Sequence, residues 1–451
     1  MWLRPFRRRA LPLRRPAQYV VATFVAASLA GAALLMLPAA SQDPGGTPFV
    51  TALFTATSAV CVTGLAVVDT AGHWTLFGEV VILVLIQAGG FGIMTVSSLI
   101  AVFLSHRLGL RHRVVAAAET GSLDLGEVRR LVVGVARFSV AVESAVAAVL
   151  FLRFLVAHDE PVGRAAYLGV FHAVSAFNNA GFALYTDSLV GFAGDPVVLI
   201  TIGAAVVVGG LGYPAWVDVA RDPRQPQRWS LHAKVTVFAT VVLLLVGAVL
   251  YSWFEWTNAE TLGGRSVGST ALNALFQSAT ARTAGFNSVD VAALTEPSRL
   301  LTEILMFIGG GSGSTAGGIK VTTFALLGWV IWAEVRGDPD VVVFSRRVPG
   351  AAQRQALTVA LLGVGTVVAA TMALMAISDL PREDLFFETI SALGTVGLTT
   401  GATPLLTGGA ELLVVGLMLL GRVGPITLFA ALVLRERRRL YRHPEERLLI
   451  G

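Results

Sequence analysis

The sequence predicts an all-α polytopic membrane protein in which four tandem repeats surround one central axis. Three observations predict it: the composition is apolar, apolar segments of spanning length recur, and one short motif occurs four times. Hydrophobic residues make up 55% of the 451 positions and charged residues only 14%, against about a quarter charged in soluble domains. The mean hydropathy is +0.72. These values exclude a soluble globular domain.

The motif consists of a Phe, a Ser or Thr four residues later, and a Gly followed by an apolar residue. Its copies are Phe54, Ser58, Gly64 and Leu65; Phe171, Ser175, Gly181 and Phe182; Phe276, Thr280, Gly285 and Phe286; and Phe387, Ser391, Gly397 and Leu398. A step of four places the Phe and the hydroxyl on one helix face. The longer, variable step to Gly indicates a helix that ends in a loop.

Each repeat is predicted to contain a span, a half-helix, a loop and a return span. The half-helices, at 49–59, 164–177, 268–279 and 383–392, are shorter than the roughly 20 residues that cross a bilayer. The return spans are expected at 75–103, 195–216, 299–334 and 411–434. We expect repeats at 18–127, 128–230, 231–353 and 354–435, between basic cytoplasmic segments at 1–17 and 436–451.

The charged residues predict the topology. Basic residues gather in the N-terminal segment, in alternate loops and in the tail, whereas the loops with the glycine motifs are richer in Asp and Glu. By the positive-inside rule, both termini are cytoplasmic and the glycine loops approach from outside. An even number of spans follows, and eight fits the apolar segments. The net charge of +5 therefore reflects a lipid bilayer and not a nucleic-acid partner.

Four glycine loops that enter one bilayer face suggest a single pseudo-four-fold cation pore. Glycine allows a narrow loop to turn its carbonyls towards the axis, and rings of carbonyls can replace the hydration shell of a monovalent cation. The predicted filter residues are Val62, Thr63, Gly64, Asn179, Ala180, Gly181, Thr283, Ala284, Gly285, Thr395, Val396 and Gly397. Asp69, Asp187 and Asp290 would attract cations at the outer mouth.

Another explanation of these glycines is close helix packing, as small residues provide in membranes. Four copies in register, each after the same Phe and hydroxyl, favour the pore. We interpret the Phe and hydroxyl side chains as packing and hydrogen-bonding groups and not as ion ligands. Asn178, Asn179, Arg282 and Thr283 also lie in the loops, where their side chains could equally hold the backbone from behind.

The return spans carry a second set of glycines in register. Arg422 aligns with Gly90, Gly210 and Gly310 of the other repeats, and a charged residue inside a membrane normally faces the protein interior or a cavity. We expect Arg422 to act as an electrostatic barrier below the filter; an interhelical salt bridge is the alternative.

The third return span is interrupted by residues 309–318, ten small residues of which six are Gly. Irregular backbone at this depth must be enclosed by protein or line a water-filled space, which makes this intramembrane loop a candidate gate. The gate residues are Gly310, Gly311, Ser312, Gly313, Ser314, Thr315, Gly317, Lys320 and Arg422. Lys320 could anchor the loop to a carbonyl or repel cations, and the sequence favours neither.

No catalytic constellation is present in the sequence, because the His residues are scattered without metal-binding spacing. We therefore predict that the protein is not an enzyme. An alternating-access secondary transporter for another cation or a small solute is the main alternative. That class commonly has inverted repeats, whereas these repeats run parallel.

The loop sequences resemble the filter loops of the Trk/Ktr/HKT superfamily of potassium transporters. They lie at 59–65, 175–182, 281–287 and 394–400. Residues 314–320 resemble the superfamily's intramembrane loop, and Arg422 matches its pore arginine. The resemblance covers the chain from about residue 17 to its end, and the eight-span length and the C-terminal sequence favour the KtrB-type membrane subunit over TrkH.

The resemblance implies potassium uptake, often sodium-dependent, by a homodimer in a bacterial inner membrane. It also implies a cytoplasmic ring of KtrA-type RCK subunits that acts on the intramembrane loop, so nucleotide would reach this chain only through the partner. K⁺ is then the transported ion, with Na⁺ as a candidate second one. Ser312 departs from the pattern, because relatives commonly have Pro there. The resemblance therefore does not extend to the stiffness of this loop.

Overall fold

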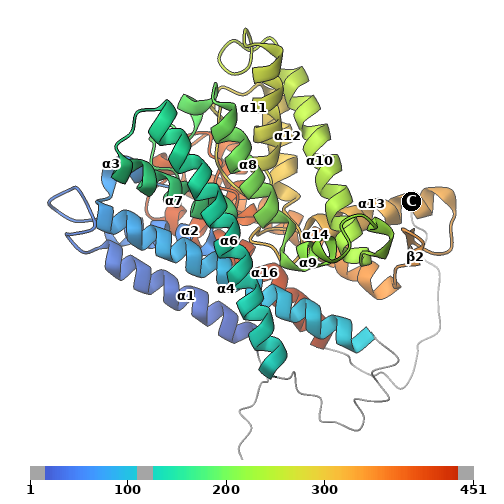
Figure 1. Ribbon diagram of the computed structural model, residues 1–451. Helices are drawn as coiled ribbons and strands as arrows, with labels where there is room; N and C mark the ends of the chain where they lie inside the picture. Colours follow the sequence, from blue (N-terminus) through green and yellow to red (C-terminus); the bar gives the residue numbers. More distant parts are fainter. Residues whose placement is uncertain (1–15, 109–124, 435–451) are drawn as a thin grey trace, which may run out of the picture.

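The computed structural model describes residues 16–108 and 125–434, which are mostly α-helical (Figure 1). In chain order it contains α1 (Pro16–Leu35), α2 (Phe49–Cys61), α3 (Thr70–His73), α4 (Leu76–Leu108), α6 (Leu125–Ala157), α7 (Val162–Asn178), α8 (Pro196–Leu211), α9 (Tyr213–Arg221), α10 (Leu231–Glu255), α11 (Val267–Thr280), α12 (Glu296–Phe307), α13 (Val321–Arg336), α14 (Gly350–Ile377), α15 (Arg382–Gly394) and α16 (Gly409–Leu434). The expected helical fold is confirmed.

The helices follow one order four times, and we name the repeats by them. Repeat 1 contains α1, α2 and α4; repeat 2 contains α6, α7 and α8 with α9; repeat 3 contains α10 to α13; and repeat 4 contains α14, α15 and α16. The second helix of each repeat, α2, α7, α11 or α15, is the predicted half-helix. Each half-helix packs against the helix before it in the chain.

Contacts between repeats close a ring. The helix α4 of repeat 1 packs on the half-helix α7 of repeat 2, α8 on α11, α12 on α15, and α16 on α2. Each return helix therefore supports the half-helix of the next repeat, and repeat 4 is joined back to repeat 1. The four motif Phe side chains are buried in the hydrophobic core, which agrees with the packing role that the sequence suggested.

The half-helices begin where the sequence provides a start signal. Proline directly precedes three of them: Pro48 before α2, Pro161 before α7 and Pro381 before α15. Proline is tolerated at a helix start because the N–H that it lacks has no hydrogen-bond partner within the helix at that position. Ser266 precedes α11, and its hydroxyl accepts a hydrogen bond of 3.3 Å from the N–H of Ser269. These signals fix the residue at which each half-helix begins.

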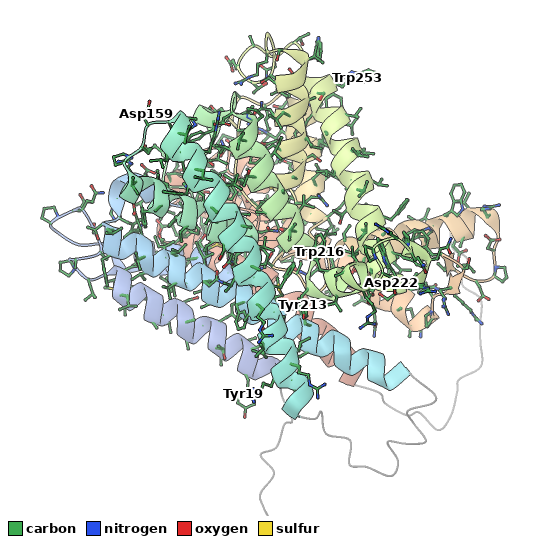
Figure 2. All side chains as sticks on the ribbon, viewed as in Figure 1. Tyr19, Asp159, Tyr213, Trp216, Asp222 and Trp253 are labelled. Atoms are coloured by element: carbon green, nitrogen blue, oxygen red, sulfur yellow. The ribbon has the colours of Figure 1, made fainter. Side chains whose placement is uncertain are left out.

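Two of the return helices are broken. The helix α8 ends at Gly212, whose φ is +88°, and continues as α9 at an angle of 96°. The predicted return span at 195–216 is therefore not one straight helix, because Gly212 adopts a backbone conformation that other residues disfavour. After the bend, α9 carries Tyr213 and Trp216 (Figure 2). Their ring centroids lie 5.9 Å and 6.2 Å from the ring centroid of Phe138 on α6. In repeat 3, residues 308–320 separate α12 from α13 without forming a helix.

Four helices of the described residues are long and apolar enough to cross a membrane, and α8 with α9 makes a fifth if the bent pair is one span. The apolar stretches Tyr19–Leu35 and Phe49–Cys61 are shorter. The eight-span count and the repeat boundaries stay predictions. The tail at 436–451 and residues 1–15 of the N-terminal segment lie outside the described residues. Neither the short helix α3 nor the antiparallel hairpin of Val342–Val343 with Arg346–Arg347 was predicted.

Candidate cation pore

The four half-helices end in loops of matching backbone geometry. The residue two positions before each motif Gly has a positive φ: 56° at Val62, 60° at Asn179, 88° at Thr283 and 50° at Thr395. A positive φ in a β-branched residue is a true outlier, and such strain persists only where the surroundings impose it. The agreement of all four loops indicates that this geometry belongs to the site and not to one local turn.

The motif glycines themselves also have positive φ values, 92° at Gly64, 70° at Gly181, 77° at Gly285 and 95° at Gly397. They form a closed ring. A Cβ added to each would lie only 3.0–3.2 Å from the Cα of the next glycine, in the order 64, 181, 285, 397 and back to 64. No gap between repeats separates the loops at this level.

Carbonyl oxygens complete the ring. A Cβ at any motif glycine would come nearer than 3.0 Å to the carbonyl oxygen of the residue before the next glycine, a distance at which atoms overlap. These carbonyls belong to Ala180, Ala284, Val396 and Thr63, which face Gly64, Gly181, Gly285 and Gly397 respectively. The sequence therefore needs glycine at these positions for space as well as for backbone conformation.

The half-helix hydroxyls hold the loops from behind. Ser58 Oγ accepts a hydrogen bond of 3.0 Å from the N–H of Gly64, and Ser391 Oγ accepts one of 3.1 Å from the N–H of Gly397. Ser175 Oγ donates to the carbonyl of Phe182 over 2.8 Å. These contacts agree with hydrogen bonding as the role of the hydroxyls, and they leave the ring carbonyls unencumbered.

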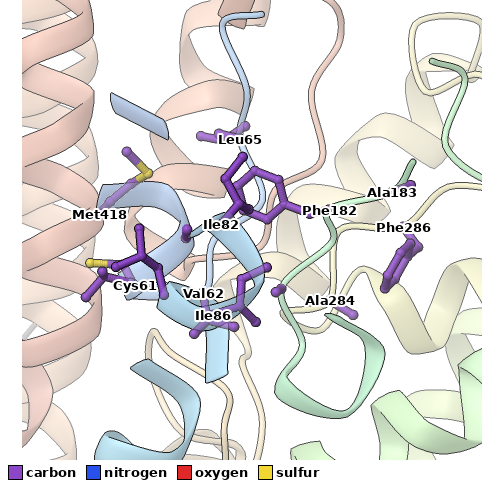
Figure 3. Packing of buried hydrophobic residues seen from close by; sticks show 14 of the residues in the cluster. Cys61, Val62, Leu65, Ile82, Ile86, Phe182, Ala183, Ala284, Phe286 and Met418 are labelled. Carbon is purple, nitrogen blue, oxygen red and sulfur yellow. The ribbon is translucent and has the colours of Figure 1, made fainter. Parts of the chain in front are cut away.

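Buried apolar side chains pack around the glycine loops. Figure 3 shows Cys61 and Val62 at the end of α2, packed with Ile82 and Ile86 of α4 and Met418 of α16. Leu65, Phe182 and Phe286, the apolar residues that follow three of the motif glycines, are buried in the same cluster. This close packing gives the loops little freedom to widen.

The side chains of the predicted filter residues are buried. The Asn179 amide lies 3.3 Å from Thr283 Oγ1 of the next repeat, so two adjacent loops are linked directly. Asn178 points away from the ring, because its Nδ2 donates to Gln87 Oε1 over 2.8 Å and to Glu143 Oε1 over 3.2 Å. Of the two roles open for Asn178, the structure favours holding the loop from behind.

The three carboxylates predicted for the outer mouth are exposed. Asp69 caps the short helix α3 and accepts a hydrogen bond of 2.8 Å from Thr186 of repeat 2. Asp187 and Asp290 lie at matching places in repeats 2 and 3, and both are exposed. In repeat 4 the hydroxyl of Thr399 donates instead to the buried carboxylate of Glu388.

The return-helix glycines allow close approach to the half-helix ends. A Cβ at Gly89, Gly209 or Gly421 would overlap the carbonyl oxygen of Val60, Phe177 or Leu393, respectively. These carbonyls occupy the same place in three half-helices. A substitution by alanine would therefore push a return helix away from the loop that it supports.

The segment 308–320 crosses between α8 and α16. The N–H of Gly311 donates to the carbonyl of Gly210 over 2.8 Å, and that of Gly318 to the carbonyl of Gly421 over 3.2 Å. The segment contains the predicted gate residues Gly310, Gly311, Ser312, Gly313, Ser314, Thr315, Gly317 and Lys320, all buried except the half-buried Ser312 and Lys320. Its hydrogen bonds tie it to two repeats other than its own.

Arg422 meets this segment from α16. Its side chain is only 2% exposed, and its Nη1 donates to the carbonyl of Thr315. Arg422 forms no ion pair with a described residue, and its Nε and Nη2 have no hydrogen-bond partner there, which argues against the salt-bridge alternative. Lys320 Nζ donates to the carbonyls of Ala316 and Gly317. The anchoring role of Lys320 is therefore the better supported of its two readings.

Sequence reasoning missed the two buried carboxylates near the loops. Glu143 lies within the apolar helix α6, where an acidic residue is unusual enough to be a signal of function. Glu388 directly follows the motif Phe of repeat 4 and is fully buried. Within the described residues, no group of three or more His, Cys, Asp or Glu side chains could hold a metal ion.

The apolar helical fold, in which four glycine loops meet at one ring, matches a class of membrane proteins that transport cations. The chain belongs to the TrkH family of cation transport proteins, whose family model matches residues 3–438. It is 39% identical over 433 residues to the Ktr system potassium uptake protein B of Vibrio alginolyticus, covering 96% of this chain and 94% of that protein. The protein of the same name from Bacillus subtilis is 37% identical, with 97% of each chain covered.

Two further comparisons agree with this assignment. The potassium/sodium uptake protein NtpJ of Enterococcus hirae is 36% identical over 442 residues, with 97% of each chain covered. The crystal structure of the potassium transporter TrkH from Vibrio parahaemolyticus matches with a TM-score of 0.74 over 94% of this chain and 86% of that one, at 18% identity. The structural match supports the fold alone. Membership of a transport family confirms that the chain is not an enzyme.

Proposed function

We propose that this protein takes up potassium ions through the ring of glycine loops. The observation that carries the proposal is the closed order of Gly64, Gly181, Gly285 and Gly397, each against the carbonyl of the next loop. The names of the relatives point to the same ion, because two are potassium uptake proteins. A ring of carbonyls supplies oxygen ligands for a dehydrated K⁺ without a fixed charge.

Two features near the ring attract cations. Exposed carboxylates at Asp69, Asp187 and Asp290 raise the local cation concentration. The half-helices point their C-terminal ends at the ring, where the partial negative charge favours a cation. Both effects act on any monovalent cation, so the preference for K⁺ comes from the spacing of the carbonyls.

The intramembrane loop and Arg422 form the gate in this proposal. The guanidinium places a positive charge below the ring, and its bond to the Thr315 carbonyl couples it to the loop. Loop movement would break that bond together with the bonds from Gly311 and Gly318. A conducting path thus requires the loop to leave α8 and α16.

Regulation and assembly follow the KtrB-type assignment. We propose a homodimer in the bacterial inner membrane with both termini cytoplasmic, and a cytoplasmic RCK ring of the KtrA type that binds nucleotide and acts on the loop. The name of the Enterococcus relative includes sodium, so Na⁺ dependence is part of the proposal. An alternating-access mechanism has less support, because the four loops meet at a single ring.

The test is uptake of Rb⁺ into proteoliposomes that contain the full chain with a KtrA-type ring. We expect saturable uptake that K⁺ inhibits at much lower concentration than Na⁺. Equal inhibition by K⁺ and Na⁺ would contradict the filter. Absence of uptake with the ring and its nucleotide present would contradict the transport function itself.

A further inference from the structure

The residue directly after each motif Phe is buried behind the loop of its own repeat. These residues are Thr55, His172, Gln277 and Glu388. Glu388 accepts hydrogen bonds from the hydroxyls of Thr399 and Thr403, the second over 2.5 Å. Both threonines follow Gly397 in the sequence, so the carboxylate holds the segment that leaves the repeat 4 loop by hydrogen bonds.

His172 does the same in repeat 2. Its Nδ1 lies 2.8 Å from the carbonyl of Leu168, which requires the proton on Nδ1, and its Nε2 then accepts a hydrogen bond of 3.4 Å from the N–H of Leu184. Leu184 follows Gly181, as Thr399 follows Gly397. At the matching position of repeats 1 and 3, the Thr55 hydroxyl and the Gln277 amide have no partner among the described residues.

Repeat 2 has a second support on the inner side of its loop. Asn178, directly before the loop, donates to Gln87 Oε1 of α4 and Glu143 Oε1 of α6, and Gln87 Nε2 donates to Glu143 Oε2 over 3.3 Å. Glu143 is 8% exposed. The carboxyl oxygens of Glu143 accept the bonds from both Asn178 and Gln87, so Glu143 is the acceptor on which this network depends.

The supported loops lie opposite each other. In the ring, repeat 2 contacts repeats 1 and 3, and repeat 4 contacts repeats 3 and 1. Repeats 2 and 4 therefore form one diagonal, on which the residue after the motif Phe bonds to the segment that follows the motif Gly. Repeats 1 and 3 form the other diagonal, on which that residue makes no such bond among the described residues. The backbone of the ring is therefore four-fold, whereas the hydrogen bonds from the residue after the motif Phe follow a two-fold pattern.

We propose that Glu388 and Glu143 are positioning residues, Glu143 acting through Asn178. They set the separation of the carbonyls on the diagonal of repeats 2 and 4, and thereby the preference of the ring for K⁺ over Na⁺. The inference rests on the proposed function, because it assumes that the ring binds K⁺. A ring that can contract accepts the smaller ion, and two opposite loops held apart are sufficient to prevent contraction.

The experiment compares Glu388→Met and Glu143→Met with Gln277→Met. All three replacements remove polar atoms and keep a similar side-chain length, but Gln277 has no bond to lose. The affinities of the full-length purified protein for K⁺ and Na⁺ are measured by titration calorimetry, which does not depend on an open gate. We expect each Glu variant to reduce the affinity ratio by about tenfold, equal to about 1.4 kcal/mol, and Gln277→Met to leave it within about twofold.

Thermal unfolding of each variant shows whether it folds. If Glu388→Met does not unfold cooperatively, Thr403→Val replaces it, because that variant removes the bond from the other side with a nearly isosteric residue. An unchanged ratio in the folded Glu388 and Glu143 variants, or an equal loss in Gln277→Met, would overturn the inference while leaving the proposed function intact. A wild-type protein without preference for K⁺ would overturn both.

Discussion

The ring of glycines makes a quantitative prediction for Gly285→Ala. The change adds one methyl group at a φ of +77°, nearer than 3.0 Å to the carbonyl oxygen of Val396. The chain contains a matched control in Gly264, which has the same φ of +77° and no atom within 4 Å of an added Cβ. Comparison of the two alanine variants separates backbone strain from crowding.

Backbone strain alone should destabilise Gly264→Ala by about 1–2 kcal/mol, the penalty for a left-handed conformation of an L-residue. Gly285→Ala carries the same penalty plus about 1–3 kcal/mol for inserting a methyl group into a tightly packed site. The Val396 carbonyl must move to relieve the overlap. Because that carbonyl is one of the ring's cation ligands in our proposal, the ratio of K⁺ to Na⁺ affinity should fall at least tenfold.

Denaturant or thermal unfolding in detergent gives the stability difference, and titration calorimetry with K⁺ and Na⁺ gives the affinity ratio. Gly264→Ala should keep the wild-type ratio. If Gly285→Ala matched Gly264→Ala in both stability and ion preference, the close approach of the loops would have no consequence and the reasoning from the ring would be refuted.

Three further predictions follow from neighbouring contacts. Gly421→Ala should destabilise the protein by more than about 1 kcal/mol in thermal unfolding, because its Cβ overlaps the Leu393 carbonyl; a wild-type midpoint would contradict this packing. Arg422→Gln should raise Rb⁺ uptake into proteoliposomes severalfold, since it removes the buried charge below the ring, and unaltered uptake would count against a barrier. Asp195 should stabilise the fold in a pH-dependent way: burial opposes its ionisation, but hydrogen bonds from Arg153 and His158 outweigh burial and lower its pKa below the ordinary 3.8. Its contribution to the free energy of unfolding is therefore complete above the unfolded-state pKa and is lost as the pH falls through the lower folded-state pKa. The stabilities of wild type and Asp195→Asn should therefore converge at low pH. A stability difference that does not change with pH would be evidence against the assigned pKa shift.

The sequence predicted the half-helices within a few residues because their start and stop signals are local. A proline or serine begins each helix, and a glycine loop ends it. The meeting of the four loops was predictable from the repetition of the motif. Its closed order, with Gly397 against Thr63, was not, because it depends on contacts between residues far apart in the chain.

The features that sequence reasoning missed depend on tertiary contacts. The bend at Gly212 follows from its close approach to the intramembrane loop, where a Cβ would lie 2.8 Å from the backbone of Gly313 and Ser314. Glu388 has no distinguishing local pattern, because the matching residues of the other repeats are of different types. Only the structure shows that its carboxylate accepts hydrogen bonds from the hydroxyls of Thr399 and Thr403.

The central claim, that the glycine loops form a cation-binding ring, is tested most directly by locating the ion. We would determine a structure of the protein in a rubidium salt and calculate the anomalous difference density. The account predicts a Rb⁺ peak on the ring axis, bounded by the carbonyls of Thr63, Ala180, Ala284 and Val396. A well-ordered ring with no peak on its axis, or with Rb⁺ bound only elsewhere in the protein, would contradict the account.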